Sequence, residues 1–218
     1  MNIEHRLARI LEIQDIWKEH FSRPQLKWEI CDNEDEQAWI ESGRYHLNNT
    51  TTSRWNFYHL ESGIDFRDDH YIISARMRLH SAESGYAFGL VFGFDRYPRR
   101  LNRFVLNSKM NFTIIADFNR EDSSPFERKS ALLDRKKVLQ EQDDVEMVIM
   151  KISRTIYFFI NDLKHPVFAV DKDFFAFTGG RLGFYTEPGI HISAESIIVK
   201  RLITESLNEI NAGDLLKA

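Results

Sequence analysis

Three closely spaced carboxylates form the only pattern in this sequence that resembles catalytic chemistry. Glu141, Asp143 and Glu146 lie within one short segment. Alternate residues of a β-strand share one face, so such a spacing can present a nucleophile and a general acid about 5 Å apart, as retaining hydrolysis of a glycosidic bond requires. These residues fall, however, at the turn that enters the expected strand 145–153. We therefore interpret them as solvated turn residues and predict no catalytic site.

The histidines and the single cysteine show no metal-ligand or nucleophile pattern. Asp95, Asn102 and Asp117 could offer oxygen ligands to calcium, but no loop motif supports such a site. Cys31 is expected to be a small buried residue at the end of a strand. No histidine lies at metal-ligand spacing from another histidine or from the cysteine, so we expect surface or strand-face residues, no metal and no cofactor. The eight histidines are His5, His20, His46, His59, His70, His80, His165 and His191.

An arginine-rich segment is the clearest candidate for binding. Arg96, Tyr97, Arg99 and Arg100 share one expected loop, and Arg103 lies at the start of the next strand. Arginines beside an exposed tyrosine suit acidic or planar partners, because the guanidinium group pairs with carboxylates and stacks on rings. We interpret this segment as a binding loop for an acidic protein or an anionic glycan. A solvated, charged turn is the alternative.

Aromatic residues elsewhere could form a platform for sugar rings. Trp55, Tyr58, Tyr97 and Tyr185 could serve if they are exposed beside amides or carboxylates. The alternative is that they pack in the core or at its rim, as aromatic residues of strands commonly do.

The two ends of the chain have helical patterns. Apolar residues within 2–21 recur at intervals of mostly three or four, so we predict an N-terminal helical segment, residues 1–24. Residues 204–218 are expected to form a helical tail. The helices would pack together on the rest of the molecule, or one would dock onto a partner or a second copy, with Trp17 and Phe21 as anchors.

The chain between these ends has the pattern of antiparallel strands. Residues 71–80 alternate apolar and polar side chains over a long run, which predicts a strand with one solvated face. Residues 87–94 place small residues on one face, which indicates either a close approach of another part of the chain or a concave strand. In the last strand, 190–202, the apolar phase shifts, and a bulge near Glu195-Ser196 would explain the shift. Residues 119–137 are expected to form a long surface connection.

These elements predict a single all-β unit over residues 25–203. Helices are absent between the strands, which excludes an architecture of alternating strands and helices. About twelve short strands with regular turn signals favour a two-sheet antiparallel β-sandwich. A length of 218 residues and a hydrophobic fraction of 43% are sufficient for one large core.

Composition limits the classes of partner and compartment. A net charge of −4 argues against nucleic-acid binding, which needs a basic surface. No stretch approaches the roughly 18 apolar residues of a membrane span, so no membrane partner is expected. A single cysteine excludes an internal disulfide and favours a reducing compartment, and the N-terminus carries no apolar run after a basic start. We therefore expect a cytoplasmic protein.

Three segments together resemble the bacterial branch of the concanavalin A-like lectin/glucanase superfamily, which has a laminin G-like jelly-roll fold. They are Gly85–Phe94, Thr155–Asp162 and Gly179–Tyr185, the last followed by the strand 190–199. Phe92 stands where the family usually has Trp, and Asp162 where it usually has Gly. Both changes are mild, because the aromatic position and the turn survive.

The start of the expected sandwich also fits this family. Trp39 with Gly43, Arg44 and Tyr45 resembles an early family motif, so the resemblance covers about residues 28–202. It implies a jelly-roll sandwich, to which the predicted short terminal helices would be added. Relatives include glycan-binding domains, glucanases and non-catalytic modules of intracellular bacterial signalling or protease proteins, so the motifs say more about fold than about activity.

These observations lead to three hypotheses of function. The first is a non-catalytic protein-interaction or accessory module of an intracellular bacterial-type assembly, in signalling, proteolysis or defence. The second is a carbohydrate-binding module, and the third is a glycoside hydrolase. A homo-oligomer is compatible with the first two.

Overall fold

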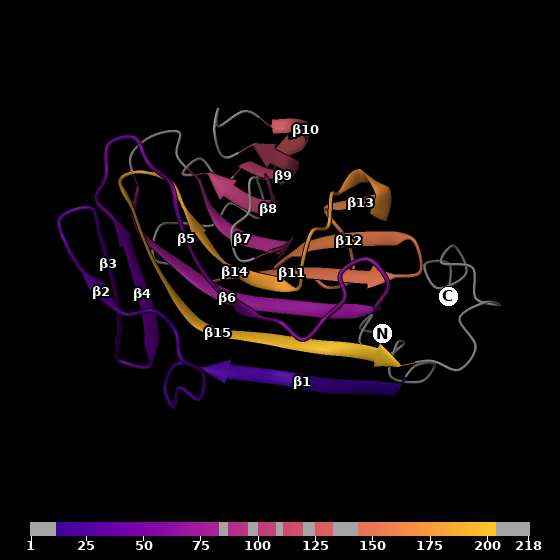
Figure 1. Ribbon diagram of the computed structural model, residues 1–218, viewed down its shortest axis with the longest axis horizontal. Coiled ribbons are helices and arrows are strands. Elements are labelled where there is room, and N and C mark those ends of the chain that lie inside the picture. The colour runs from indigo at the N-terminus through magenta and orange to yellow at the C-terminus, as the bar shows by residue number, and fades with distance from the viewer. Residues whose placement is uncertain are drawn as a thin grey trace.

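The computed structural model describes residues 12–82, 87–95, 100–107, 111–119, 125–132 and 144–203, with β9 and β10 described by their backbone alone. In these residues the chain forms two antiparallel sheets that pack face to face (Figure 1). This architecture confirms the predicted two-sheet β-sandwich.

The larger sheet has nine strands in the order β13-β12-β11-β6-β15-β4-β3-β2, and β1 also pairs with β15. Its strands are β1 (Glu12–His20), β2 (Cys31–Asp32), β3 (Glu36–Glu41), β4 (Arg44–Asn49), β6 (Tyr71–Ala82), β11 (Asp144–Ile152), β12 (Thr155–Ile160), β13 (Phe168–Asp171) and β15 (Ile190–Ile203).

The smaller sheet has six strands in the order β10-β9-β8-β7-β14-β5. They are β5 (Asn56–Glu61), β7 (Ala87–Phe94), β8 (Arg100–Asn107), β9 (Asn111–Asn119), β10 (Pro125–Leu132) and β14 (Arg181–Thr186). A 3-10 turn, η2 (Lys172–Phe174), precedes β14.

The long strand β15 lies at the centre of the larger sheet and changes partner along its length. Residues 190–194 pair with β4, residues 196–203 pair with β1, and β6 pairs with most of the opposite edge. The register with β6 shifts between Ala194 and Ser196, which confirms the bulge expected there. Because of this shift, both Ile192 before it and Ile197 after it are buried in the core.

The main core fills the space between the two sheets. The predicted inward residues of β6 all belong to it: Ile73, Ala75, Met77 and Leu79. Smaller apolar clusters lie on the outer faces, around Val148 and Phe159 on the larger sheet and around Val91 and Tyr185 on the smaller one. Each sheet therefore also carries apolar side chains on the face that does not meet the other sheet.

Two turns of the larger sheet contain residues with positive φ. Ser42 and Gly43 join β3 to β4 with φ values of 51° and 77°, as a two-residue hairpin turn requires. Asn161 follows β12 with φ 57°, in the left-handed region that asparagine tolerates.

The small residues of β7 and β14 allow neighbouring strands to come close. A β-carbon on Gly89 would lie 2.2 Å from the carbonyl oxygen of Phe104, and one on Gly183 would lie 2.0 Å from that of Tyr58. Of the two explanations for the small residues of 87–94, the close approach is therefore confirmed.

The predicted N-terminal helix is wrong where the structure describes it, because residues 12–20 form β1. Register between β1 and β15 shifts between Asp15 and Trp17. Ile13 consequently packs with the outer cluster, whereas Ile16 and Trp17 pack against the main core. This change of face explains why the apolar spacing imitates a helix. Residues 1–11 and the tail 204–218 lie outside the described residues.

The expected surface connection 119–137 is also wrong in part, because residues 125–132 form β10. This strand pairs only with β9 and is the edge of its sheet. Charged residues and a proline at the first position suit an edge strand, and their polarity hid the strand from a search for alternating apolar residues. Among the described residues, no helix is long and apolar enough to cross a membrane.

Gly183→Ala is expected to lower the free energy of unfolding by about 3 kcal/mol or more, because a methyl group would collide with the Tyr58 carbonyl. Gly180→Ala is the matched control, since its β-carbon would meet nothing closer than the Ile64 carbonyl at 3.2 Å, and we expect a loss below about 1 kcal/mol. Chemical denaturation measures both. Equal losses in the two variants would contradict the close strand approach.

Candidate functional site

A stripe of aromatic rings runs along β5 on the outer face of the smaller sheet. We define this aromatic stripe as Trp55, Phe57, His59 and Tyr185. Trp55 lies 5.6 Å from Phe57 and 5.8 Å from Tyr185 between ring centroids, and Phe57 stacks on His59 at 5.2 Å. Alternate residues of β5 face outward, while Tyr58 faces the core and is 3% exposed. Trp55, Phe57 and His59 are partly exposed, whereas Tyr185 is buried.

The buried side chain of Arg103 holds the Tyr185 ring in place. Arg103 is 3% exposed, donates a hydrogen bond to the Tyr185 hydroxyl and places its guanidinium carbon 4.5 Å from the centre of the ring. The hydroxyl in turn donates to Glu187 at 3.2 Å, and Glu187 accepts from the backbone of Ala87 at 2.8 Å. Burial, opposed by Arg103 and reinforced by Glu187, raises the pKa of Tyr185, so the phenol stays neutral. Tyr185 therefore supports the stripe and does not offer its own face.

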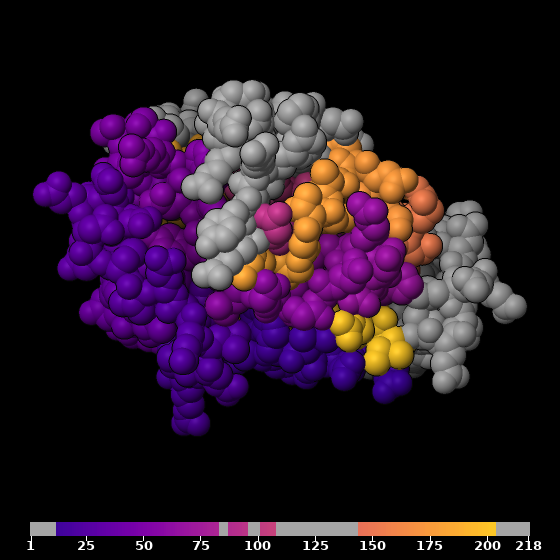
Figure 2. Space-filling view, in the orientation of Figure 1, coloured from indigo at the N-terminus to yellow at the C-terminus, as the bar shows by residue number. Residues whose placement is uncertain are grey.

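Polar side chains, Arg181 and Glu61, lie next to the His59 end of the aromatic stripe. Arg181 lies between His59, whose Nδ1 is 2.8 Å from Nη1, and Glu61, whose Oε1 is 2.8 Å from Nη2. Directly beyond them lies a pocket of about 430 Å³, lined by the segments 64–67 and 177–180. In Figure 2, residues of the β5–β6 connection (magenta) lie against residues that lead into β14 (orange). The Arg181–Glu61 pair thus adjoins the stripe through His59 and lies next to Gly180, one of the residues that line the pocket.

The structure brings together part of the residues that the sequence indicated. Trp55 and Tyr185, both predicted platform residues, meet in the stripe, and Arg103 contacts Tyr185. Arg103 lies on β8, on a strand as expected, but its side chain is buried and is not exposed for binding. Arg96, Tyr97 and Arg99 lie outside the described residues, and of Arg100 only the backbone is described, at the start of β8.

The two predicted anchors near the N-terminus contact the protein itself. Phe21 is 1% exposed and stacks on Tyr45 at 5.2 Å, so it is a core residue and not a surface anchor. Trp17 is partly buried, and its indole nitrogen donates to the Ser62 carbonyl at 3.0 Å. Both contacts follow from β1 being a strand of the larger sheet.

Of the carboxylate motif, only Glu146 lies among the described residues, and it is on the sheet opposite to the aromatic stripe. Glu141 and Asp143 are outside the described residues, and Glu146 is exposed on β11 of the larger sheet. Asp144, beside them, contacts three guanidinium groups: Arg44 at 2.9 Å, Arg78 at 3.0 Å and Arg76 at 3.3 Å. Burial favours the neutral acid, but hydrogen bonds and charges of Arg78 and Arg44 outweigh it and lower the pKa of Asp144. An acid held ionised in this way cannot donate a proton near neutral pH.

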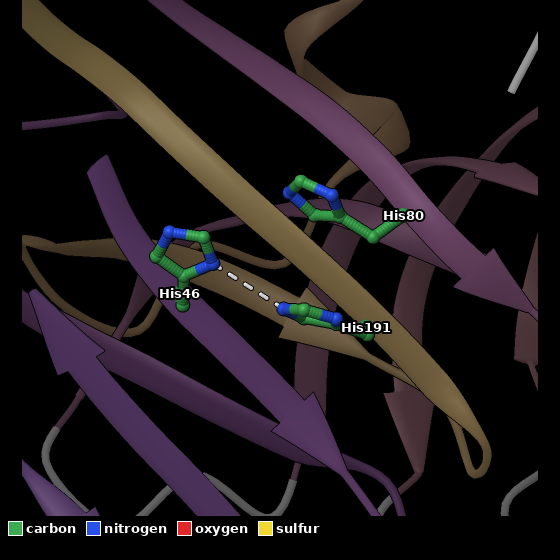
Figure 3. A group of neighbouring side chains, drawn as sticks. All are labelled: His46, His80 and His191. Carbon is green, nitrogen blue, oxygen red and sulfur yellow. Dashed lines mark hydrogen bonds between the residues drawn. The ribbon is translucent and has the colours of Figure 1, made fainter. Parts of the chain in front are cut away.

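A group of three histidines is the feature that sequence spacing missed. His46, His80 and His191 come from β4, β6 and β15 and converge on the outer face of the larger sheet (Figure 3). Each stands beside an inward apolar residue, so the strand alternation could place each of them on that face. Their convergence depends on the strand order β6-β15-β4, which no local spacing encodes.

Comparison with known proteins finds no matching family model and no matching curated sequence. Solved structures do match. The catalytic domain of an endo-1,3-beta-glucanase (laminarinase) from Thermotoga petrophila RKU-1 has a TM-score of 0.60 and 10% identity, over 90% of this chain and 100% of that chain. The CBM2 module of the evolved Dit of Lactobacillus casei BL23 phage J-1 has a TM-score of 0.58 and 9% identity, over 90% and 99%.

The VIP36 exoplasmic/lumenal domain, in its Ca2+/Man3GlcNAc-bound form, is also similar, with a TM-score of 0.58 and 10% identity, over 96% of this chain and 97% of that chain. These structures share the concanavalin A-like jelly roll, and this chain has the same fold. The resemblance drawn from the three sequence motifs is thereby confirmed at the level of fold.

Asp144→Asn is expected to destabilise the protein by about 2 kcal/mol at neutral pH, since Arg44 and Arg78 would lose a partly buried partner. The pKa of Asp144 is lower in the folded chain, so the unfolded chain binds its proton first as the pH falls. The stabilisation by ionised Asp144 is therefore complete above the ordinary pKa of an aspartate, and it is lost as the pH falls from there through the lower pKa of the folded chain. Chemical denaturation at a series of pH values from neutral to acid should show that the free energy of unfolding falls less steeply in the variant than in the parent protein.

Glu34→Gln is the matched control for this prediction, because Glu34 is exposed between β2 and β3. It should leave the unfolding free energy and its acid dependence unchanged. An Asp144→Asn variant as stable as the parent at every pH would contradict the role of Asp144.

Proposed function

We propose that this concanavalin A-like sandwich is a non-catalytic carbohydrate-binding module that binds a neutral oligosaccharide along the aromatic stripe. The observation that carries the proposal is the row of partly exposed rings of Trp55, just before β5, and of Phe57 and His59 within it, next to a polar pair and near a pocket. Sugar rings expose C–H groups on their faces, which pack against aromatic rings, while their hydroxyl groups need planar hydrogen-bonding partners. Arg181 and Glu61 are such partners.

The length and charge of the site favour a particular kind of glycan. Positions 55, 57 and 59 span about 13 Å of extended chain, which favours an oligosaccharide over a single sugar. Arg181 contacts Glu61, and Arg103 contacts Glu187, so each of these cations has a carboxylate beside it. A site in which the charges are balanced favours a neutral glycan over an anionic one.

The spacing of carboxylates supports binding over hydrolysis. Glu61 lies opposite Arg181 at one end of β14, and Glu187 follows the other end. Six positions of a strand separate them, about 20 Å, whereas the two acids of a glycosidase lie about 5–10 Å apart. Each is also bound within the protein, Glu61 to Arg181 and Glu187 to Tyr185.

Known structures support a carbohydrate-binding role over our first sequence-based hypothesis, a protein-interaction module. The similar structures include a carbohydrate-binding module and a lectin domain bound to a mannose-containing glycan. The binding residues expected under the interaction hypothesis were those of the arginine-rich loop, with Trp17 and Phe21. Phe21 belongs to the core, and Trp17 is partly covered and bonded to Ser62.

Trp55→Ala should weaken glycan binding at least about tenfold, or about 1.4 kcal/mol, because it removes the largest ring of the stripe. A glycan array identifies the ligand, with a soluble β-1,3-glucan as the first probe, and titration calorimetry then measures its affinity. Trp39→Ala is the matched control, since Trp39 is also partly exposed but lies on the larger sheet. The glycan affinity of the Trp39→Ala variant should equal that of the parent protein.

Three results would contradict this proposal. An array on which the folded protein binds no glycan would exclude the binding function, and equal affinities of the Trp55→Ala and Trp39→Ala variants would place the site elsewhere. Release of reducing sugar from the bound glucan would contradict the non-catalytic role. Melting temperatures of both variants confirm that they are folded.

A further inference from the structure

Three imidazoles meet on the outer face of the larger sheet, on the sheet opposite to the aromatic stripe. His46 on β4, His191 on β15 and His80 on β6 lie on three neighbouring strands (Figure 3). Leu47, Ile192 and Leu79 beside them are buried in the core, so each histidine points outward from a fixed backbone. A site built on adjacent paired strands holds its side chains more firmly than one built on loops.

The spacing of the ring nitrogens fits a metal ion. Nδ1 of His46 lies 3.3 Å from Nε2 of His191, and one ring nitrogen from each of the three histidines lies within 4.8 Å of the others. Two nitrogens bound to a tetrahedral zinc ion at 2.0–2.1 Å lie about 3.4 Å apart. The His46–His191 pair already has this separation. The His80 ring stacks on His191 at 4.5 Å and supplies the third nitrogen of the group.

Neighbouring residues orient two of the rings. Trp39 stacks on His46 at 4.8 Å with an interplanar angle of 13°, and its indole nitrogen donates to Glu41 at 3.2 Å. The buried Ser193 places its hydroxyl 2.8 Å from Nε2 of His80. Metal-binding histidines commonly use their second nitrogen in this way, because the hydrogen bond fixes the tautomer and the direction of the ring.

The positive charges of the arginines near the three histidines are paired with carboxylates. Arg44, whose Nη1 lies 3.5 Å from the Ser193 hydroxyl, is paired with Asp144 and with Glu195. Arg76 contacts both of these acids, and Arg78 contacts Asp144. The carboxylates therefore offset most of the charge that would oppose a cation at the histidines.

We propose that His46, His80 and His191 bind a divalent transition-metal ion of the zinc class, with a fourth position open to water or another ligand. Imidazole is a ligand that zinc, copper and nickel accept, and three histidines with one open position are a known zinc arrangement. The alternative is a stack of neutral rings that only packs on the sheet.

Zinc titration of the full chain in a buffer without chelating groups tests this proposal. We expect one zinc ion per chain, with binding weakened at least about 100-fold in the His46→Gln and His191→Gln variants. His165→Gln is the matched control, because the His165 side chain is 78% exposed and lies outside the group. Its affinity should not change. Melting curves without metal verify that all three variants fold.

Cobalt substitution identifies the ligands independently of the variants. Cobalt bound by three imidazoles should give the visible absorption of a four- or five-coordinate ion without a thiolate-to-metal band. A thiolate band would place the metal at Cys31 and overturn the proposal. Absence of saturable zinc binding, or equal zinc affinity in the parent and both histidine variants, would overturn it as well. Zinc binding by the Trp55→Ala variant should be normal, which separates this site from the proposed glycan site.

Discussion

The hydrogen bonding of β15 along both of its edges organises the larger sheet. One edge pairs with β6, and the other pairs first with β4 and then with β1. Side chains alternate between the two faces along a regular strand, so residues with even and odd numbers face opposite sides. If Ile190 and Ile192 faced the core of a regular strand, Ile197 and Val199 would therefore face away from it. The shift between Ala194 and Ser196 corrects the phase, so all four are buried. The same alternation turns His191 outward between His46 and His80.

Much of this arrangement could be predicted from local sequence, because its signals are local. The alternation of β6, the change of phase in β15 and the glycines of β7 each depend on residues close together in the chain. β1 could not be recognised, since its apolar residues change face at a register shift that only pairing with β15 produces. β10 was missed because an edge strand needs few apolar residues.

The candidate sites show the same limit. Trp55 and Tyr185 could be suspected singly as exposed aromatic residues, but Phe57 and His59 join them only through the outward face of β5. The histidine group is a stronger case, because residues 46, 80 and 191 are distant in sequence and become neighbours through strand order alone. The two faces then differ in chemistry: aromatic rings with paired ions on one sheet, imidazoles and arginines on the other. The jelly roll positions both without specifying either.

The pairing of β1 with β15 also determines how the molecule responds to force. Glu12 lies opposite Ile203, and the two strands run antiparallel from that point. Tension applied through residues 12 and 203 would therefore open the pair from one end, one hydrogen-bonded position after another, and would not load all its bonds together. Loss of β1 in this way would expose one edge of β15 along residues 196–203, while β4 and β6 would still hold the rest of that strand. The first step of mechanical unfolding would then require little force and would leave most of the sandwich intact.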